Sequence, residues 1–243
     1  MTEENLNLPA SKLPLDQEES PSSKDFRGSF HWRIFRIIAE FVNGWQFLAD
    51  FQKMVSIFGS ARTATNDKWY EEARKLANML AKDGMSIVTG GGPGIMQAGN
   101  QGAVEAKESA GESAGDSIGL NIKLPYEQRI NKYVRKSVAF HYFFVRKVML
   151  SYYAQAYVYF PGGYGTLDEM FELITLIQTK KVPKIPIILV GKDFWQPLAD
   201  WMTNNMLGKY QAIDKEDLDL FKVVDGAQEA YDLIKKSPMR SEF

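Results

Sequence analysis

Three glycine-containing loops follow short apolar runs in this 243-residue chain, and all three could bind an anion. Glycine lets the backbone approach a ligand closely, and a helix that begins after the loop presents free N–H groups and the positive end of its dipole. Tight strand-to-helix turns are the alternative explanation for glycines. The candidate phosphate-binding residues in these loops are Gly59, Ser60, Gly91, Gly92, Gly162, Gly163, Gly165 and Thr166.

The loops lack the two common nucleotide fingerprints. Counting from Gly90, the sixth position of G-x-G-x-x-G is Ile95, and Gly191-Lys192 is followed by Asp193 rather than Ser or Thr. These departures disfavour a dinucleotide coenzyme and exclude a P-loop by pattern. The loops therefore predict a smaller phosphorylated ligand.

Two carboxylates lie just beyond the third loop. Thr166 with Glu169 matches a capping box, in which Thr166 is the N-cap and Glu169 is N3, and this alone would explain both residues. Glu169 and Glu172 also share one helix flank beside the expected phosphate site. A glutamate there could polarise water or stabilise a positively charged, oxocarbenium-like sugar centre.

Arg146 lies on the apolar face of an expected helix and needs a partner there. One interpretation is a snorkelling or structurally paired arginine. The other is that Arg146 meets Glu169 or the ligand, with Lys147 beside it facing the loops. A guanidinium suits phosphate and carboxylate equally well.

The elements that must position these residues alternate along the chain. Residues 54–59, 85–90, 117–122, 156–160 and 185–190 are apolar throughout, which is typical of buried parallel strands. Residues 67–82, 95–107, 141–153 and 166–179 have helical spacing. This alternation predicts an α/β fold, a doubly wound parallel sheet with helices on both faces. Ligands of such sheets bind outside the carboxyl ends of the strands, where all three loops should lie.

Composition excludes several classes of function. The chain has no cysteine and only two histidines, so a metal site is not expected. Its net charge of −1 gives no global field for binding nucleic acid. No signal peptide or membrane span is recognised, and we expect a cytoplasmic protein without a membrane partner.

The chain divides into three predicted parts. Residues 1–25 contain three prolines and six acidic residues against two lysines, which predicts a disordered acidic tail. Residues 26–52 form an amphipathic helix whose stripe covers either its own domain or a subunit interface. Residues 53–238 form the nucleotide-binding catalytic domain. Light scattering should detect a homo-oligomer, a dimer or larger.

The motifs P-G-G-Y-G-T-L-D-E at 161–169, G-G-G-P-G-I-M at 90–96 and Arg146-Lys147 together resemble the LONELY GUY phosphoribohydrolases, also described as possible lysine decarboxylases. The N-terminal helix and F-G-S-A-R at 58–62 resemble the longer, type II-like members. The likeness spans roughly residues 54–190. It implies a Rossmann-like fold and hydrolysis of the N-glycosidic bond of a nucleoside 5′-monophosphate, such as a cytokinin riboside monophosphate or AMP, without a cofactor.

The resemblance also implies roles for individual residues. Arg146 and Glu169 match the catalytic pair, Lys147 matches the adjoining basic residue, and the glycines of the second and third loops, with Thr166, match the phosphate-binding turns. Where type I members have Met-His-x-Arg-Lys, this chain has Tyr142-Phe143-Phe144-Val145-Arg146-Lys147. That departure bears on which base is preferred.

Two other functions remain open at this point. A non-catalytic sensor could hold a mononucleotide in the same glycine loops without cleaving it. A lysine decarboxylase would need pyridoxal phosphate and a Schiff-base lysine in a defined setting, which the sequence does not reveal.

Overall fold

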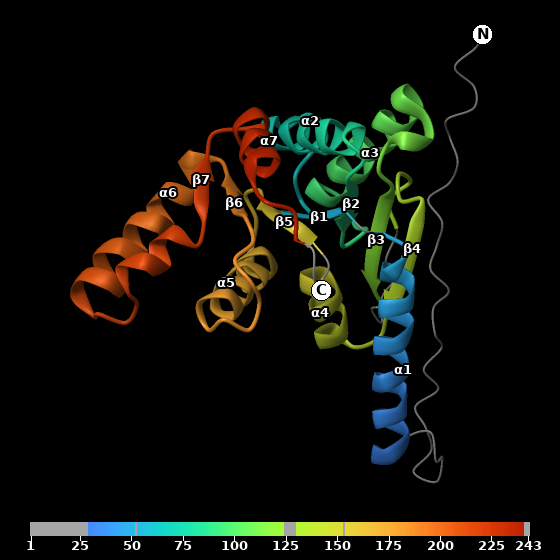
Figure 1. Ribbon diagram of the computed structural model, residues 1–243, viewed down its shortest axis with the longest axis horizontal. Helices are drawn as coiled ribbons and strands as arrows, with labels where there is room; N and C mark the ends of the chain where they lie inside the picture. Colours follow the sequence, from blue (N-terminus) through green and yellow to red (C-terminus); the bar gives the residue numbers. More distant parts are fainter. Residues whose placement is uncertain (1–28, 52, 124–129, 153, 241–243) are drawn as a thin grey trace.

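A seven-stranded parallel sheet forms the core of the described residues, with strand order β4-β3-β2-β1-β5-β6-β7 (Figure 1). The computed structural model describes residues 29–51, 53–123, 130–152 and 154–240, so the predicted tail 1–25 lies outside them. The predicted doubly wound sheet is confirmed. The strands are β1 (Met54–Phe58), β2 (Ser86–Thr89), β3 (Ser117–Ile122), β4 (Lys136–Phe140), β5 (Ala154–Tyr159), β6 (Ile187–Val190) and β7 (Lys222–Val224).

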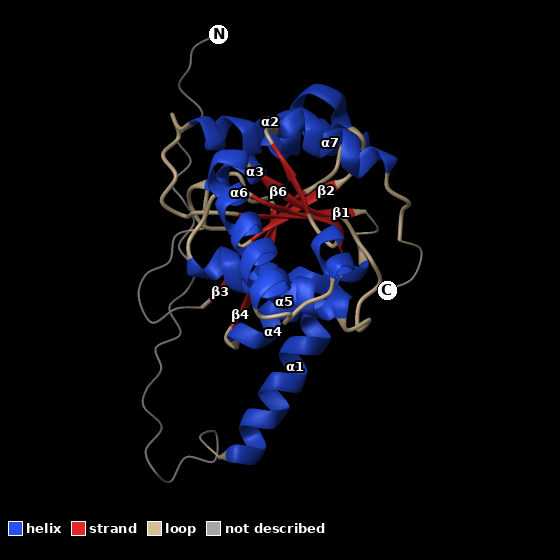
Figure 2. Cartoon of the chain, turned by 90° about the vertical axis from the view of Figure 1, so that its left-hand side faces the viewer, coloured by secondary structure: helices blue, strands red, loops and turns tan. Residues whose placement is uncertain are grey.

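Helices cover both faces of the sheet (Figures 1 and 2). One apolar layer contains side chains of α2, α3 and α7, and the other contains side chains of α1, α4, α5 and α6. Neighbouring residues of β1 supply opposite layers, because successive strand residues point to opposite faces. The helices are α1 (Phe30–Ala49), α2 (Lys68–Lys82), α3 (Ile95–Ala110), α4 (Phe143–Tyr152), α5 (Tyr164–Gln178), α6 (Lys192–Trp201) and α7 (Ala227–Lys236).

The strand order reverses beside β1. The chain builds β1 to β4 outward in one direction and then returns to place β5 on the other side of β1. Sheets of this kind bind ligands where the order reverses, outside the carboxyl ends of the strands. The loops after β1 and β5 lie at that position.

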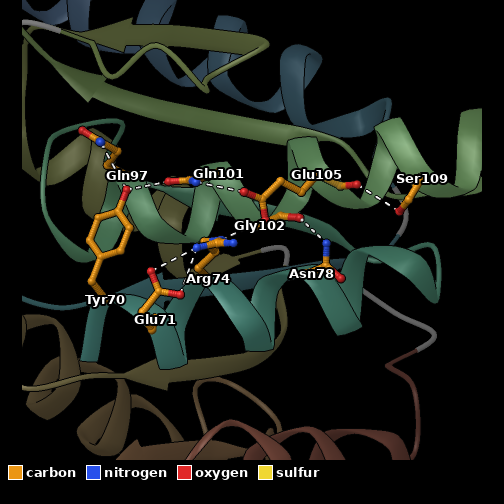
Figure 3. A network of polar contacts seen from close by, with 9 residues as sticks. All are labelled: Tyr70, Glu71, Arg74, Asn78, Gln97, Gln101, Gly102, Glu105 and Ser109. Carbon is orange, nitrogen blue, oxygen red and sulfur yellow. Dashed lines mark hydrogen bonds and ion pairs between the residues drawn. The ribbon is translucent and has the colours of Figure 1, made fainter. Parts of the chain in front are cut away.

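Helices α2 and α3 pack closely through a glycine and a polar network (Figure 3). A Cβ atom at Gly102 would lie 2.1 Å from the carbonyl oxygen of Arg74, so no larger residue fits there. Arg74 Nε donates to Glu105 at 2.9 Å, and the hydroxyl of Tyr70 donates to Gln101 at 2.8 Å. This seam sets the position of α3, whose first turn follows the second glycine loop.

Helix α1 packs against the body only through part of its length. Leu48 is buried, but Phe30, Ile34 and Ile38 are 70%, 40% and 52% exposed. The predicted apolar stripe is therefore covered only toward its C-terminal end, and α1 extends away from the body in Figure 1. No helix among the described residues is long and apolar enough to cross a membrane.

Candidate active site

The three glycine loops interlock at the carboxyl edge of the sheet. Ser60 N–H donates to the carbonyl of Pro161 at 3.0 Å, and the Ser60 carbonyl accepts from Ile95 N–H at 3.0 Å. Gly94 has φ +67°, and a Cβ atom there would lie 2.3 Å from the Ser60 carbonyl oxygen. Glycine at position 94 thus allows the first and second loops to touch, while Ser60 joins the first loop to the third.

A cleft of about 660 Å³ opens at this junction. Seven of the residues predicted from the sequence line it: Gly59, Ser60, Arg146, Gly163, Gly165, Thr166 and Glu169. Ten further lining residues were not among the predicted site residues, and they include Arg62, Met96, Phe143, Tyr164 and Asp168. The sequence could have indicated three of these residues. Arg62 and Tyr164 belong to the segments of the glycine loops, and Phe143 precedes Arg146 by nearly one helical turn.

Gly91 and Gly92 do not line the cleft. Gly91 has φ +72° and its N–H donates to Thr89 Oγ1 at 3.0 Å. The carbonyls of Gly91 and Gly92 accept from the backbone and side chain of Asn131, at 2.9 Å in both cases. These contacts give the two glycines a structural explanation, as parts of a buried turn.

Gly162, Lys147 and Glu172 also lie outside the cleft lining. A Cβ atom at Gly162 would lie 2.1 Å from Thr166 Oγ1, so glycine is needed for the third loop to meet α5. Lys147 Nζ lies 2.8 Å from Asp168 and 3.1 Å from Glu172. In the free protein this ammonium group is therefore engaged by carboxylates.

The N-terminus of α5 faces the cleft without a side-chain cap. The capping-box prediction is wrong: the N-cap is Gly163, the helix begins at Tyr164, and Thr166 occupies N3. Glu169 lies a full turn further along, too far to cap the helix. The first N–H groups of an α-helix have no intrahelical partner, so those of this turn can bind an anion.

Arg146 extends from α4 to the cleft wall, where its guanidinium carbon lies 5.2 Å from the centre of the Phe143 ring. Its buried Nε has no hydrogen-bond partner among the described residues. Burial lowers the pKa of Arg146, and the nearby charge of Glu169 opposes that change. An arginine remains protonated even so, which leaves a cation at the cleft wall with an unpaired, buried Nε donor.

Glu169 is only 6% exposed, although it borders the cleft. Its Oε2 has no hydrogen-bond partner among the described residues. Burial raises the pKa of Glu169 to about 7, while the charges of Arg146 and then Lys147 act to lower it. A carboxyl group with this pKa exchanges a proton near neutral pH, as a general acid or base must.

The residues that line the cleft do not favour pyridoxal phosphate as a resident cofactor. Pyridoxal chemistry on amino acids requires a lysine amine that forms a Schiff base with the cofactor. Among the described residues that line the cleft there is no lysine, and adjacent Lys147 is paired with two carboxylates. The residues present do not fit this cofactor.

The chain has an α/β fold with a cleft at the carboxyl edge of its parallel sheet, and sequence comparison places it in a family. The family described as "Possible lysine decarboxylase" matches residues 96–234, and the chain belongs to it. The chain is 28% identical over 156 residues to the cytokinin riboside 5′-monophosphate phosphoribohydrolase LOG of Oryza sativa subsp. japonica, covering 63% of this chain and 60% of that protein. It is 27% identical over 144 residues to LOG7 of Arabidopsis thaliana, covering 58% and 62%. The resemblance to the LONELY GUY family is thereby confirmed.

Solved structures share the fold. The molybdenum cofactor binding protein of Rippkaea orientalis superposes with a TM-score of 0.56 at 19% identity, covering 76% of this chain and 96% of that one. The molybdenum cofactor carrier protein of Chlamydomonas reinhardtii gives 0.55 at 21% identity, covering 76% and 97%. At this identity the likeness establishes the Rossmann-like architecture alone.

Proposed function

We propose that the protein hydrolyses the N-glycosidic bond of a nucleoside 5′-monophosphate to a free base and ribose 5-phosphate. The observation that carries the proposal is the buried pair Arg146 and Glu169 at one cleft, beside an uncapped helix N-terminus. The activity named for the two LOG relatives supports the same reaction, although the chain matches only about 60% of their length.

The 5′-phosphate binds at the first turn of α5. The N–H groups that follow Gly163 and the positive end of the helix dipole attract it, and the close Gly162–Thr166 contact keeps the loop compact. Ser60 and Arg62 border the same cleft from the neighbouring loop. Gly59 there allows close packing, because a Cβ atom would lie 2.7 Å from Ile95.

The ionised form of Glu169 acts at the sugar. As the C1′–N bond breaks, the base leaves with the bonding electrons and takes up a proton, while positive charge develops on the ribose. The carboxylate stabilises that charge or polarises the water whose oxygen adds to C1′. Arg146 orients the carboxylate and the substrate hydroxyls with its free Nε donor.

The base lies against the aromatic side of the cleft. Phe143 lines the cleft and is 52% exposed, so it offers an apolar face to a purine. The names of the LOG relatives favour a cytokinin riboside monophosphate. AMP, which carries an unsubstituted adenine, is the second proposed substrate.

Product analysis tests the reaction. Purified wild type and Glu169→Gln are incubated with AMP and with isopentenyladenosine monophosphate, and free base and ribose 5-phosphate are quantified. We expect release by the wild type alone. Tight binding of AMP by both proteins with no release from either would overturn the hydrolase and indicate a mononucleotide sensor.

We also propose that the protein forms a homo-oligomer. The exposed apolar residues of α1 and the half-exposed Phe144 support a homo-oligomer, because contiguous apolar surface of this kind marks interaction sites. Light scattering of the full chain at micromolar concentration should give at least twice the monomer mass, and a monomer would contradict the proposal.

A further inference from the structure

Glu40, from the N-terminal helix α1, holds the turn that leads into the helix carrying Arg146. Its Oε1 accepts from the backbone N–H of His141 at 2.8 Å, and its Oε2 accepts from the N–H of Tyr142 at 3.1 Å. These two residues form the whole connection between β4, which ends at Phe140, and α4, which begins at Phe143. One carboxylate thus fixes both N–H groups of the turn.

The next hydrogen bond reaches Arg146 itself. The carbonyl of Tyr142 accepts from the backbone N–H of Arg146 at 3.2 Å, in the first turn of α4. Glu40 is therefore connected to the Arg146 backbone through a single residue. The buried Nε of Arg146 has no hydrogen-bond partner among the described residues, and Phe143, whose ring lies beside the guanidinium, belongs to the same helix. A shift of α4 would therefore move both the Arg146 side chain and the ring beside it.

The packing around Glu40 leaves little freedom for the turn. A Cβ atom at Gly44, one helical turn after Glu40, would lie 2.8 Å from the sulfur of Met149 and 3.0 Å from the ring of Phe140. Helices α1 and α4 consequently meet at close range, and Figure 2 shows α1 running up to the end of the body where α4 lies.

From this geometry we propose that Glu40 is a positioning residue for the active site, acting through the 141–142 turn to set the place of Arg146. The inference rests on the proposed function for its kinetic consequence. It assigns α1 a part in the chemistry in addition to its apolar surface. A displacement of a catalytic group by about 1 Å can cost on the order of 100-fold in rate.

The chain contains a matched control. Glu72 Oε2 accepts from the backbone N–H of Ala227 at 2.6 Å, where α7 begins on the opposite face of the sheet. Glu72→Ala removes the same kind of long-range contact from a helix start far from the cleft. Glu40→Ala, Glu40→Gln and Glu72→Ala are therefore compared for unfolding midpoint, kcat and KM on AMP, and affinity for ribose 5-phosphate.

We expect Glu40→Ala to lower kcat by about 10-fold or more, and Glu72→Ala to leave kcat within about twofold. Glu40→Gln keeps an acceptor oxygen and should recover much of the activity. Affinity for ribose 5-phosphate should persist in all three, because the α5 turn is untouched. In an Arg146→Ala background, Glu40→Ala should have little further effect. Equal kcat losses in Glu40→Ala and Glu72→Ala, or full additivity with Arg146→Ala, would overturn the proposal.

A spectroscopic readout separates this inference from the proposed reaction. The Nε–H signal of Arg146 is identified in a nitrogen-proton NMR spectrum by its absence in Arg146→Ala. Glu40→Ala should shift or broaden that signal, and Glu72→Ala should not. The measurement holds even if the wild type cleaves no nucleotide, and an unchanged signal in Glu40→Ala would refute the positioning role.

Discussion

Replacing Glu169 with glutamine should remove a large pH dependence from the stability of the free protein. Burial raises the pKa of this carboxyl from 4.5 to about 7. One pKa unit corresponds to about 1.4 kcal/mol, so ionising Glu169 costs about 3 kcal/mol more in the folded protein than in the unfolded chain. Glutamine has no charge to form and avoids this cost.

The direction in which stability changes with pH follows from the pH at which the folded and the unfolded state each lose the proton of Glu169. Below pH 4.5 the carboxyl is protonated in both states. Between pH 4.5 and 7 the unfolded chain ionises first, so the wild-type protein loses stability as the pH rises. Above pH 7 both states are ionised and the penalty is constant. From pH 5 to pH 8.5 the wild type should lose about 2.5 kcal/mol that the Glu169→Gln variant keeps.

Urea unfolding of both proteins at pH 5 and pH 8.5 measures this quantity. The pH-independent effect of packing an amide in place of a carboxyl cancels when the two differences are subtracted. Asp83→Asn is the control: the Lys235 ammonium and the Tyr231 hydroxyl hold the pKa of Asp83 below its ordinary 3.8, so its contribution should not change between these pH values. If the stability of the wild type changed with pH in parallel with that of Glu169→Gln, the reasoning that burial of Glu169 outweighs the nearby positive charges would be refuted.

Further predictions concern activity. Arg146→Ala should lower kcat by about 100-fold in steady-state assays with AMP, because the cation that orients Glu169 is lost. The wild-type kcat/KM should fall as the pH drops through about 7, since protonation neutralises the Glu169 carboxylate. Lys147→Met removes a charge that lowers the Glu169 pKa, so the same pH profile should move to higher pH. Phe143→Ala should raise KM for AMP while Phe144→Ala, an equally exposed neighbour outside the cleft lining, should not.

The sheet could be predicted where its strands are buried on both faces. Apolar runs in the sequence coincide with five of the strands: β1, β2, β3, β5 and β6. The edge strands β4 and β7 have no such run, because part of their residues is exposed. Strand β6 begins at Ile187, two residues after the start of the predicted run 185–190, since Pro186 has no N–H to donate to a neighbouring strand. The hydrophobic pattern thus predicted the central strands of the sheet and missed its two edge strands.

Much of the candidate site was visible in the sequence, because parallel strands bring their following loops to one edge. What could not be predicted was long-range. The Glu40 contact joins residues about one hundred positions apart, and the burial of Glu169 depends on how α4 and α5 pack. The start of α5 was misplaced because Gly163 takes the N-cap position by backbone geometry alone, which the Thr166–Glu169 pattern concealed.

The misplaced cap changes how Glu169 should be understood. A glutamate at N3 would bind a backbone N–H and stabilise the free protein, so its presence would need no chemistry. In the structure Glu169 has no such role, and two buried polar atoms of the pair, Arg146 Nε and Glu169 Oε2, have no hydrogen-bond partner among the described residues. Each buried unsatisfied group costs about 1–3 kcal/mol. A pair that served only the fold would bond to each other and remove this cost. Unpaired polar atoms on two residues that line the same cleft are instead suited to a ligand, and the proposed hydrolysis at a ribose carbon would use both residues.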